Sequence, residues 1–499
     1  MKKIEHRSSV VAALAGVEAW ERFSFYGMQA ILVYYLYRDL GMPEADATAL
    51  VGAYGASLYL CTFAGGWVGD RVFGPERTLL SGCGLLVIGH LSLATIPGYA
   101  GLGAGLIAIA LGSGLLKTAT ITLLGMAYPA ESGTRDAAFQ LFYLGINVGA
   151  LFGPLLTGRL AQRYSYQAGF GAAAVLMVAG AIFYGCLRPR VVATLGDAPI
   201  NQPSQPTTTA HAATAIALTL LALAAVVAGL ATGAISPSRL ATIMLVLTVV
   251  AALALFTQSL TSPRTTAAER ARVREYIPLF ICSTAYWGLF AQTAGVFAVY
   301  SDQRLDRTVA GFEIPASWTQ SLNPFYILLL SLPMAALMAA AAPRKHVSMG
   351  AGVALAGAGM FVLLPWVGGE ANSTPFLALA GCVLCMSLGE LLIGPSGMSS
   401  TGAYAPAAFR TRFSALYFLT MAIGTSLAGT ASTLYDPSNP AAERAYLLVV
   451  GSVPVLIGVA VAAAGVRRGR GPGDESLGEL PQPREQRRPR RVTASARHR

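Results

Sequence analysis

The chain has 499 residues, of which 54% are apolar and only 12% are charged. It returns repeatedly to apolar runs of about 20 residues, each long enough to cross about 30 Å of hydrocarbon, which excludes an ordinary soluble domain. Its net charge of +11 is spread over loops and a basic C-terminal tail, so lipid headgroups are a better match for it than nucleic acid.

The apolar runs predict fourteen membrane spans. They lie near 10–37, 47–69, 77–97, 101–128, 136–160, 167–187, 212–233, 240–260, 276–300, 319–342, 347–367, 373–397, 410–434 and 444–466. An even number of spans puts both termini on one side. That side carries sixteen Lys and Arg residues in its N-terminus and loops, against seven in the opposite loops. Because basic loops stay in the cytoplasm, both termini are predicted to be cytoplasmic.

The order of spans and polar segments predicts an all-α polytopic membrane protein of two six-helix bundles with two inserted helices. The expected parts are an N-terminal bundle at 1–187, a linker with a two-helix insertion at 188–275, a C-terminal bundle at 276–466 and a disordered basic tail at 467–499. Paired bundles that rock about a midplane cavity are a recurrent transporter architecture.

Five ionisable residues lie deep in the predicted spans: Glu18, Glu21, Arg22, Lys117 and Glu390. A charge at the bilayer centre costs about 3 kcal/mol, so such residues mark ion or substrate paths. The first three stand at i, i+3 and i+4 and share one helix face. Three acids against two bases leave room for one proton, although a purely structural ion pair between helices is the alternative. Glu390 is the only acid expected to be buried in the second half.

Lys117 in the fourth span and Glu390 in the tenth come from different halves. We hypothesise that they form a salt bridge that acts as a gate, breaking and re-forming in each transport cycle.

Glycines recur every four residues at Gly145, Gly149 and Gly153 in the fifth span. Such a ridge predicts the close approach of another helix backbone.

Five segments carry a family resemblance. They are EAWERFSFYG (18–27), GGWVGDRVFG (65–74), FQLFYLGINVGAL (139–151), FEIPASWTQSLNP (312–324) and GELLIGPSGMS (389–399). With them, the chain from about 10 to 466 resembles the proton-dependent oligopeptide transporter family of the major facilitator superfamily. The resemblance implies the major facilitator fold, and the two extra helices are similar to those of bacterial members.

The resemblance also implies roles for particular residues. Glu18, Glu21 and Arg22 would couple transport to protons with Lys117 as their partner, Lys117 would bind a peptide's carboxylate, and Glu390 its amine. The implied substrate-binding residues are Arg22, Tyr26, Gln29, Tyr59, Lys117, Asn147, Trp287, Gln292, Asn323 and Glu390. Each aromatic or amide residue among them could also be an ordinary core residue.

Three positions depart from the family pattern. Gln29 stands where the family usually has Arg, and Ala291 stands where it usually has Glu; in the family these two side chains face each other as a second bridge between the halves. Losing both together is coherent, because one buried charge without its partner would cost about 3 to 5 kcal/mol. Tyr417 replaces a usual Trp. Because of these three departures, the resemblance does not determine which substrate the protein carries.

The sequence therefore predicts a proton-coupled symporter of di- or tripeptides or peptide-like compounds, working by alternating access in a bacterial inner (plasma) membrane. The alternative is a major facilitator carrier of a non-peptide organic ion or an exported metabolite. An enzyme is not predicted, because no histidine cluster, nucleophile elbow or metal-ligand spacing occurs, and neither a cofactor nor a metal is expected. The expected partners are small peptides, protons and the bilayer, without nucleic acid.

Overall fold

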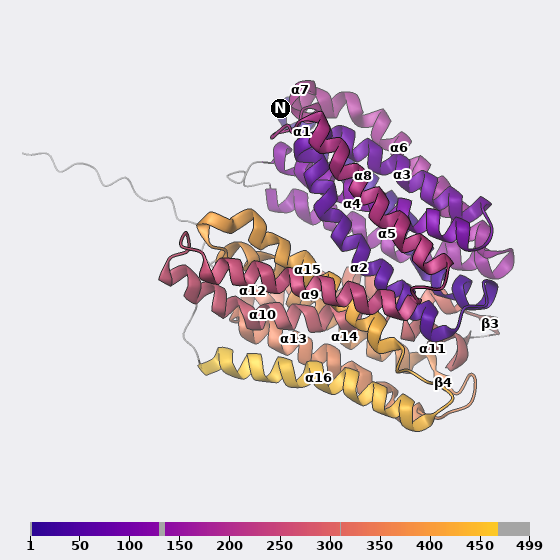
Figure 1. The fold of residues 1–499 in the computed structure, drawn as a ribbon. Coiled ribbons are helices and arrows are strands. Elements are labelled where there is room, and N and C mark those ends of the chain that lie inside the picture. The colour runs from indigo at the N-terminus through magenta and orange to yellow at the C-terminus, as the bar shows by residue number, and fades with distance from the viewer. Residues whose placement is uncertain (1, 129–134, 310, 468–499) are drawn as a thin grey trace, which may run out of the picture.

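Long helices dominate the computed structural model, which describes residues 2–128, 135–309 and 311–467 (Figure 1). The first half holds α1 (Lys2–Tyr34), α2 (Glu44–Val68), α3 (Pro75–Thr95), α4 (Gly98–Ala127), α5 (Arg135–Arg163) and α6 (Tyr166–Leu195), with π-helical turns η1 (Tyr35–Asp39) and η2 (Gly69–Phe73). The short helix α7 (Asp197–Asn201) leads to α8 (Thr209–Ala231) and α9 (Pro237–Thr261).

The second half begins with α10 (Ala267–Ala291) and α11 (Val296–Gln303) and continues through the 3-10 turn η3 (Ala316–Ser321). It is completed by α12 (Leu322–Ala341), α13 (Lys345–Gly359) with η4 (Met360–Trp366), α14 (Phe376–Tyr404), the turn η5 (Ala407–Phe409), α15 (Arg410–Ser432) and α16 (Pro440–Arg467). Two small strand pairs lie at one end: β1 (Leu305–Asp306) is parallel to β4 (Thr374–Pro375), and β2 (Thr308–Val309) is antiparallel to β3 (Phe312–Glu313).

The all-helical membrane fold predicted from the sequence is confirmed. Twelve helices in the described part of the chain are long and apolar enough to cross a membrane. The other two expected spans correspond to α1 and α10, which are equally long but carry more charge. The count of fourteen spans therefore stays a prediction for these two helices. The expected tail lies outside the described residues, apart from Arg467 at the end of α16.

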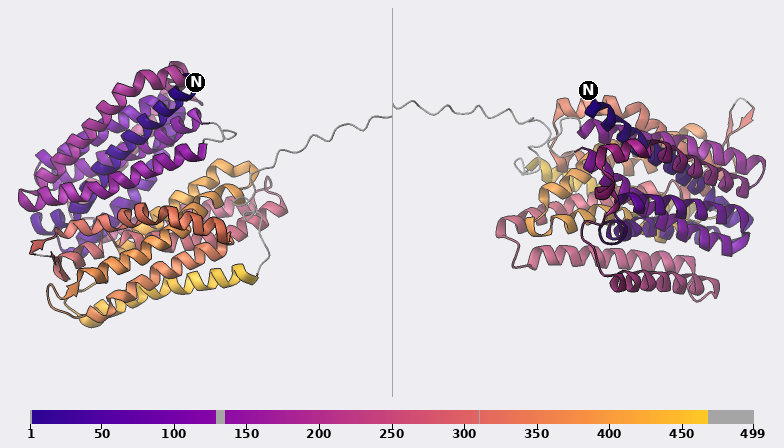
Figure 2. Two further views of the ribbon diagram at one scale, coloured as in Figure 1. Left: turned by 180° about the vertical axis from the view of Figure 1, so that it is seen from behind. Right: turned by 90° about the horizontal axis from the view of Figure 1, so that it is seen from above.

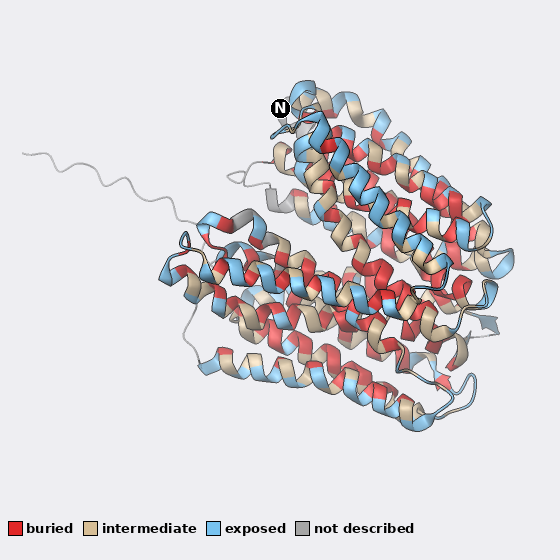
Figure 3. Ribbon diagram, in the orientation of Figure 1, coloured by how far each residue is buried: buried red, intermediate tan, exposed pale blue. Residues whose placement is uncertain are grey.

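The two halves pack separately and meet along a few helices. Within the first half α1 packs on α5 and α6 and α3 on α4, and within the second half α13 packs on α14 and α16. The α8–α9 pair runs along one side of the molecule, where α9 contacts both α2 and α15 (Figure 2). The α8 helix is largely exposed, as expected for a helix that faces lipid (Figure 3). Helix α6 continues to Leu195 and α10 begins at Ala267, so both helices extend beyond the predicted membrane spans into the 188–275 segment.

The glycine ridge of α5 packs against α1, as its spacing predicted. A Cβ atom at Gly149 would lie 2.3 Å from the Ala19 carbonyl oxygen, and one at Gly153 would lie 2.4 Å from the Phe23 carbonyl oxygen. Only glycine allows this approach, which holds α1 and its charged face in place.

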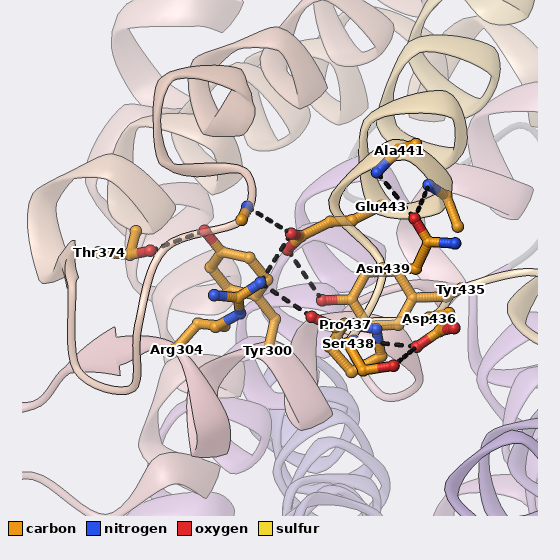
Figure 4. Close-up of polar contacts among 12 residues, drawn as sticks. Tyr300, Arg304, Thr374, Tyr435, Asp436, Pro437, Ser438, Asn439, Ala441 and Glu443 are labelled. Carbon is orange, nitrogen blue, oxygen red and sulfur yellow. Dashed lines mark hydrogen bonds and ion pairs between the residues drawn. The ribbon is translucent and has the colours of Figure 1, made fainter.

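One expectation about the second half is wrong: Glu390 is not its only buried acid. Glu443, at the start of α16, is fully buried and forms a 2.8 Å ion pair with the buried Arg304 (Figure 4). The Glu443 carboxylate also accepts the Gly368 N–H at 2.8 Å, while Arg304 donates to the Pro437 carbonyl at 3.0 Å. The sequence predicted both charges to lie in loops. They are buried because three loops fold over one another around them.

We expect Glu443→Gln to lower the free energy of unfolding by about 3 to 5 kcal/mol, because it leaves the Arg304 guanidinium buried without a counter-charge. Unfolding in a graded detergent series would measure this change. The matched control is Glu313→Gln, since Glu313 pairs with Arg307 at 3.0 Å but is mostly exposed, and it should cost about 1 kcal/mol or less. Equal losses in the two variants would contradict the expectation.

Candidate functional site

The three charges of α1 form one compact cluster. Glu18 and Glu21 are fully buried and Arg22 is nearly so. The Arg22 Nε lies 2.5 Å from Glu21 Oε2 and 3.4 Å from Glu18 Oε1, and its terminal nitrogen donates to Glu21 Oε1 at 2.9 Å. The helical spacing i, i+3, i+4 thus places both carboxylates around one guanidinium.

The α4 helix supplies a second cation to this cluster. Lys117 is partly exposed and interacts electrostatically with Glu18, Glu21 and Arg22. Its Nζ also lies 5.7 Å from the centre of the Tyr59 ring, within cation–π range. Two acids and two bases therefore balance within this cluster.

The anionic site of the second half is centred on Glu390 of α14. Tyr286 of α10 donates its hydroxyl hydrogen to Glu390 Oε2 at 3.1 Å, and the Asn323 amide of α12 donates to the same oxygen at 2.9 Å. Asn323 also donates to the Ser387 hydroxyl at 3.0 Å. Three helices thus fix the carboxylate while its residue stays partly exposed.

Tyrosines from both halves connect the two sites. Tyr26 of α1 and Tyr59 of α2 interact electrostatically with both Arg22 and Glu390. Tyr143 of α5 and Tyr417 of α15 also interact electrostatically with the Glu390 carboxylate. These tyrosines therefore lie within electrostatic range of the anionic site, and Tyr26 and Tyr59 lie within range of the cationic site as well.

The hypothesised bridge between Lys117 and Glu390 is not formed in this conformation. Within the described residues the polar partners of Glu390 are Tyr286 and Asn323, and the charges that act on Lys117 belong to α1. If the pair is a gate, this structure has it open.

Four other expected pocket residues lie in different surroundings. Gln292 is buried, and its side-chain oxygen accepts a hydrogen bond from the Tyr446 hydroxyl of α16 at 2.8 Å. Asn147 donates to the Tyr143 carbonyl of its own helix at 3.0 Å. Trp287 packs edge-on against Tyr286, with ring centres 5.4 Å apart. Gln29 is partly exposed on α1, and Ala291 ends α10.

Sequence reasoning missed several polar residues of the site. Ser113 and Thr120 on α4 contact the α1 carboxylates, and Tyr286 contacts Glu390. A signal was present for the first two: they stand four residues before and three after Lys117, on the same helix face. Tyr286 carried no such signal, because its contact depends on how α10 packs on α14.

The two halves are closed at the end that contains α11. Tyr37 and Arg38 of η1 bond to Asp302 of α11, and the Tyr34 hydroxyl donates to the Ala298 carbonyl at 3.1 Å. On α5, the Leu155 carbonyl accepts the Trp318 indole N–H at 2.9 Å. In Figure 1 the ribbons of the two halves converge here and separate toward the beginning of α1 and the end of α16.

A close helix crossing reinforces this closed end. A Cβ atom at Gly52 of α2 would lie 2.5 Å from the Gly429 Cα of α15. Backbones this near leave no room for a larger residue, so the crossing joins the halves directly.

Comparisons with known proteins point in one direction. The sequence profile of the POT family matches residues 76–446. The uncharacterized transporter YclF of Bacillus subtilis (strain 168) is 34% identical over 450 residues, covering 88% of this chain and 90% of that protein. The di-/tripeptide transporter of Lactococcus lactis subsp. cremoris is 33% identical over 462 residues, covering 89% and 92%.

Solved structures agree with these sequence matches. A variant of the peptide transporter POT, crystallised with alafosfalin, superposes with a TM-score of 0.84 at 33% identity and covers 94% of this chain and 98% of that one. A POT family transporter in complex with 5-aminolevulinic acid superposes with a TM-score of 0.83 at 27% identity, covering 92% and 96%. The family suggested by the sequence motifs is thereby confirmed, and the chain belongs to the POT family of membrane transporters.

Proposed function

We propose that this protein is a proton-coupled symporter that carries di- or tripeptides, or peptide-like compounds, across a bacterial plasma membrane by alternating access. The observation that carries the proposal is the pair of opposite charged sites: Lys117 beside the α1 cluster in one half, and Glu390 in the other. A zwitterion of peptide length has one charge for each site. Peptide transport is also the named activity of the Lactococcus relative.

In this proposal Glu390 binds the peptide's ammonium group. Both of its hydrogen-bond donors, Tyr286 and Asn323, reach Oε2. Within the described residues Oε1 accepts no hydrogen bond from a side chain, so it can take the ammonium without displacing either donor. The two donors fix the direction in which that oxygen points, which favours a ligand with its amine at one place.

Charge balance couples the peptide to the proton. Without substrate, Glu18 and Glu21 are balanced by Arg22 and Lys117. When a peptide carboxylate binds the Lys117 ammonium, the α1 acids lose part of that positive charge, and one of them then binds a proton more favourably. Release of the proton restores the attraction for Lys117 and expels the carboxylate.

The conformation corresponds to an inward-facing carrier if the termini are cytoplasmic, as the distribution of Lys and Arg predicts. The contacts of Tyr37 and Arg38 with Asp302 then close the extracellular side. Opening toward the outside requires that these contacts break while the halves approach at the cytoplasmic end.

We expect Asp302→Asn to shift the equilibrium toward the outward-open state. The change removes the charge that Arg38 pairs with, and because Arg38 is half exposed the loss should be about 1 kcal/mol, or about fivefold in the ratio of states. Distances between spin labels on the outer ends of η1 and α11 would report the shift.

The control for this measurement is Glu370→Gln, which changes an exposed acid in the neighbouring loop and should leave the label distances unchanged. Arg38→Gln should match Asp302→Asn, and the double variant should add little to either. Unchanged distances in Asp302→Asn would remove the contact from the mechanism.

The test of the proposed function is uptake of labelled dipeptides into proteoliposomes under an inward proton gradient. Stimulation by inward protons is expected, and collapse of the gradient with an ionophore should abolish accumulation. Uptake that is insensitive to the gradient would exclude symport.

One observation supports a second candidate, a carrier of a non-peptide organic ion or an exported metabolite. Gln29 and Ala291 lack the charges that the family usually pairs there, so one cationic contact for a peptide carboxylate is missing. One structural relative binds 5-aminolevulinic acid, a compound with an amine and a carboxylate but no peptide bond. Competition between dipeptides and such amino acids for a bound probe distinguishes the two candidates.

A further inference from the structure

One face of α4 is matched to the charged face of α1. Ser113, Lys117 and Thr120 stand at i, i+4 and i+7 and therefore point the same way from the helix. Ser113 contacts Glu21, and Thr120 contacts Glu18, one helical turn earlier in α1. The two helices thus bring two hydroxyls and one ammonium to two carboxylates and one guanidinium.

Ser113 binds to the pair formed by Glu21 and Arg22. Its hydroxyl donates to Glu21 Oε1 at 2.8 Å and accepts from the Arg22 terminal nitrogen at 3.1 Å. With the two direct contacts from Arg22, Glu21 has three polar contacts within 2.9 Å. The two hydrogen bonds to Oε1 and the positive charge 2.5 Å from Oε2 both stabilise the ionised carboxylate.

Thr120 contacts the other carboxylate, that of Glu18, at a longer distance than Ser113 contacts Glu21. Its hydroxyl lies 3.2 Å from Glu18 Oε2 and 3.1 Å from the Lys117 carbonyl oxygen. One hydroxyl hydrogen faces two acceptors, so it can turn from the carboxylate to the carbonyl. The second oxygen, Glu18 Oε1, is 3.4 Å from Arg22 Nε, whereas Glu21 Oε2 is 2.5 Å from the same nitrogen. Within the described residues neither of these two oxygens accepts a hydrogen bond.

We infer that Ser113 and Thr120 are positioning residues of the coupling site: Ser113 holds Glu21 as a carboxylate on Arg22, and Thr120 sets the proton exchange of Glu18. A proton from water binds the Glu18 carboxylate, the Thr120 hydroxyl turns to the Lys117 carbonyl, and loss of the proton reverses both changes. The inference rests on the proposed function and deepens it, because it assigns the proton to one of two neighbouring acids.

Other groups also face the two carboxylates. Arg22 and Tyr26 come from α1, Tyr54 from α2, Cys83 from α3 and Lys117 from α4, and Tyr59 of α2 acts on Arg22. Variants of the two hydroxyls leave all of these unchanged, so a difference between variants reports the hydroxyl itself.

The experiment is an infrared titration of the purified protein in nanodiscs, which follows the C=O stretch of protonated carboxyl groups against pH. Subtracting the spectrum of Glu18→Gln identifies the Glu18 band. We expect Thr120→Val to raise the pH midpoint of this band by about one unit, or about tenfold in proton affinity, because the ionised form loses its hydroxyl donor. Thr120→Ser keeps the donor and should restore the wild-type midpoint.

Two further variants make the test specific. Ser113→Ala should leave the Glu18 midpoint in place, since the side-chain hydrogen bonds of Ser113 among the described residues join it to Glu21 and Arg22. Thr122→Val is the matched control, because Thr122 is exposed and its hydroxyl donates to the Thr118 carbonyl of its own helix, with no other partner in the part of the chain that the structure describes. An unchanged midpoint in Thr120→Val, or an equal shift in Ser113→Ala or Thr122→Val, would overturn the assignment.

The same variants in proteoliposomes connect the inference to transport. The pH optimum of dipeptide uptake should move upward in Thr120→Val and return in Thr120→Ser. The infrared titration needs no substrate, so it tests the roles of the two hydroxyls even if the protein carries no peptide. Failure of wild-type uptake to respond to protons would count against the proposed function alone.

Discussion

Glu21→Gln is expected to abolish uphill accumulation and to spare counterflow. In the wild type a membrane potential of 100 mV supplies about 2.3 kcal/mol per charge, or about fiftyfold in concentration. The variant frees Arg22 from Glu21, so the guanidinium can pair fully with Glu18, which lies 3.4 Å away. The remaining carboxylate then faces two cations, Arg22 and Lys117, and has no reason to bind a proton.

Two assays in the same proteoliposomes separate the effects. Accumulation under a gradient should fall to the level set by simple equilibration, while exchange of labelled for unlabelled substrate should continue. Glu370→Gln, which changes an exposed loop acid, should retain both activities. Persistent uphill accumulation in Glu21→Gln would show that the α1 cluster does not couple protons to transport.

Glu390→Gln is expected to weaken dipeptide binding by about 3 kcal/mol, or more than a hundredfold in Kd. The reason is that a peptide ammonium enclosed in the site would lose its counter-charge. Tyr286 and Asn323 can still contact the Gln oxygen, so the packing of α10, α12 and α14 should be retained. Titration calorimetry with purified protein would measure the change.

An N-acetylated dipeptide is the matched probe for this prediction. It has no ammonium group, so the wild type should bind it about as weakly as Glu390→Gln binds the free dipeptide. The variant should then discriminate little between the two ligands. If Glu390→Gln still prefers the free dipeptide by the wild-type ratio, the amine binds elsewhere.

Much of the fold and of the candidate site could be predicted from local sequence patterns. Apolar runs of membrane length and charged loops predicted the helices, because both depend on neighbours along the chain. The i, i+3, i+4 spacing placed Glu18, Glu21 and Arg22 together for the same reason, and the structure brings them within 3.4 Å. The spacing of Gly149 and Gly153 likewise predicted their contact with another helix, although not that the partner is α1.

Contacts between segments that are distant in the sequence could not be predicted from local patterns. The sequence predicted Glu443 and Arg304 to be charges in loops, yet three loops fold over them and bury them as an ion pair. The sequence predicts Gln292 as a pocket residue, and it does not predict its hydrogen bond with Tyr446, which depends on how α10 packs on α16. No pattern near either residue in the chain contains the partner that decides its environment.

The sequence by itself determined that this protein is a helical membrane carrier of the POT family with a charged face on its first helix. Only the tertiary structure decided that Tyr286 and Asn323 hold Glu390 and that Lys117 lies within electrostatic range of the α1 acids. It also decided that Ser113 contacts Glu21 and Thr120 contacts Glu18. The physical reason is that periodicity along a helix selects a face, whereas the packing of helices selects what that face meets.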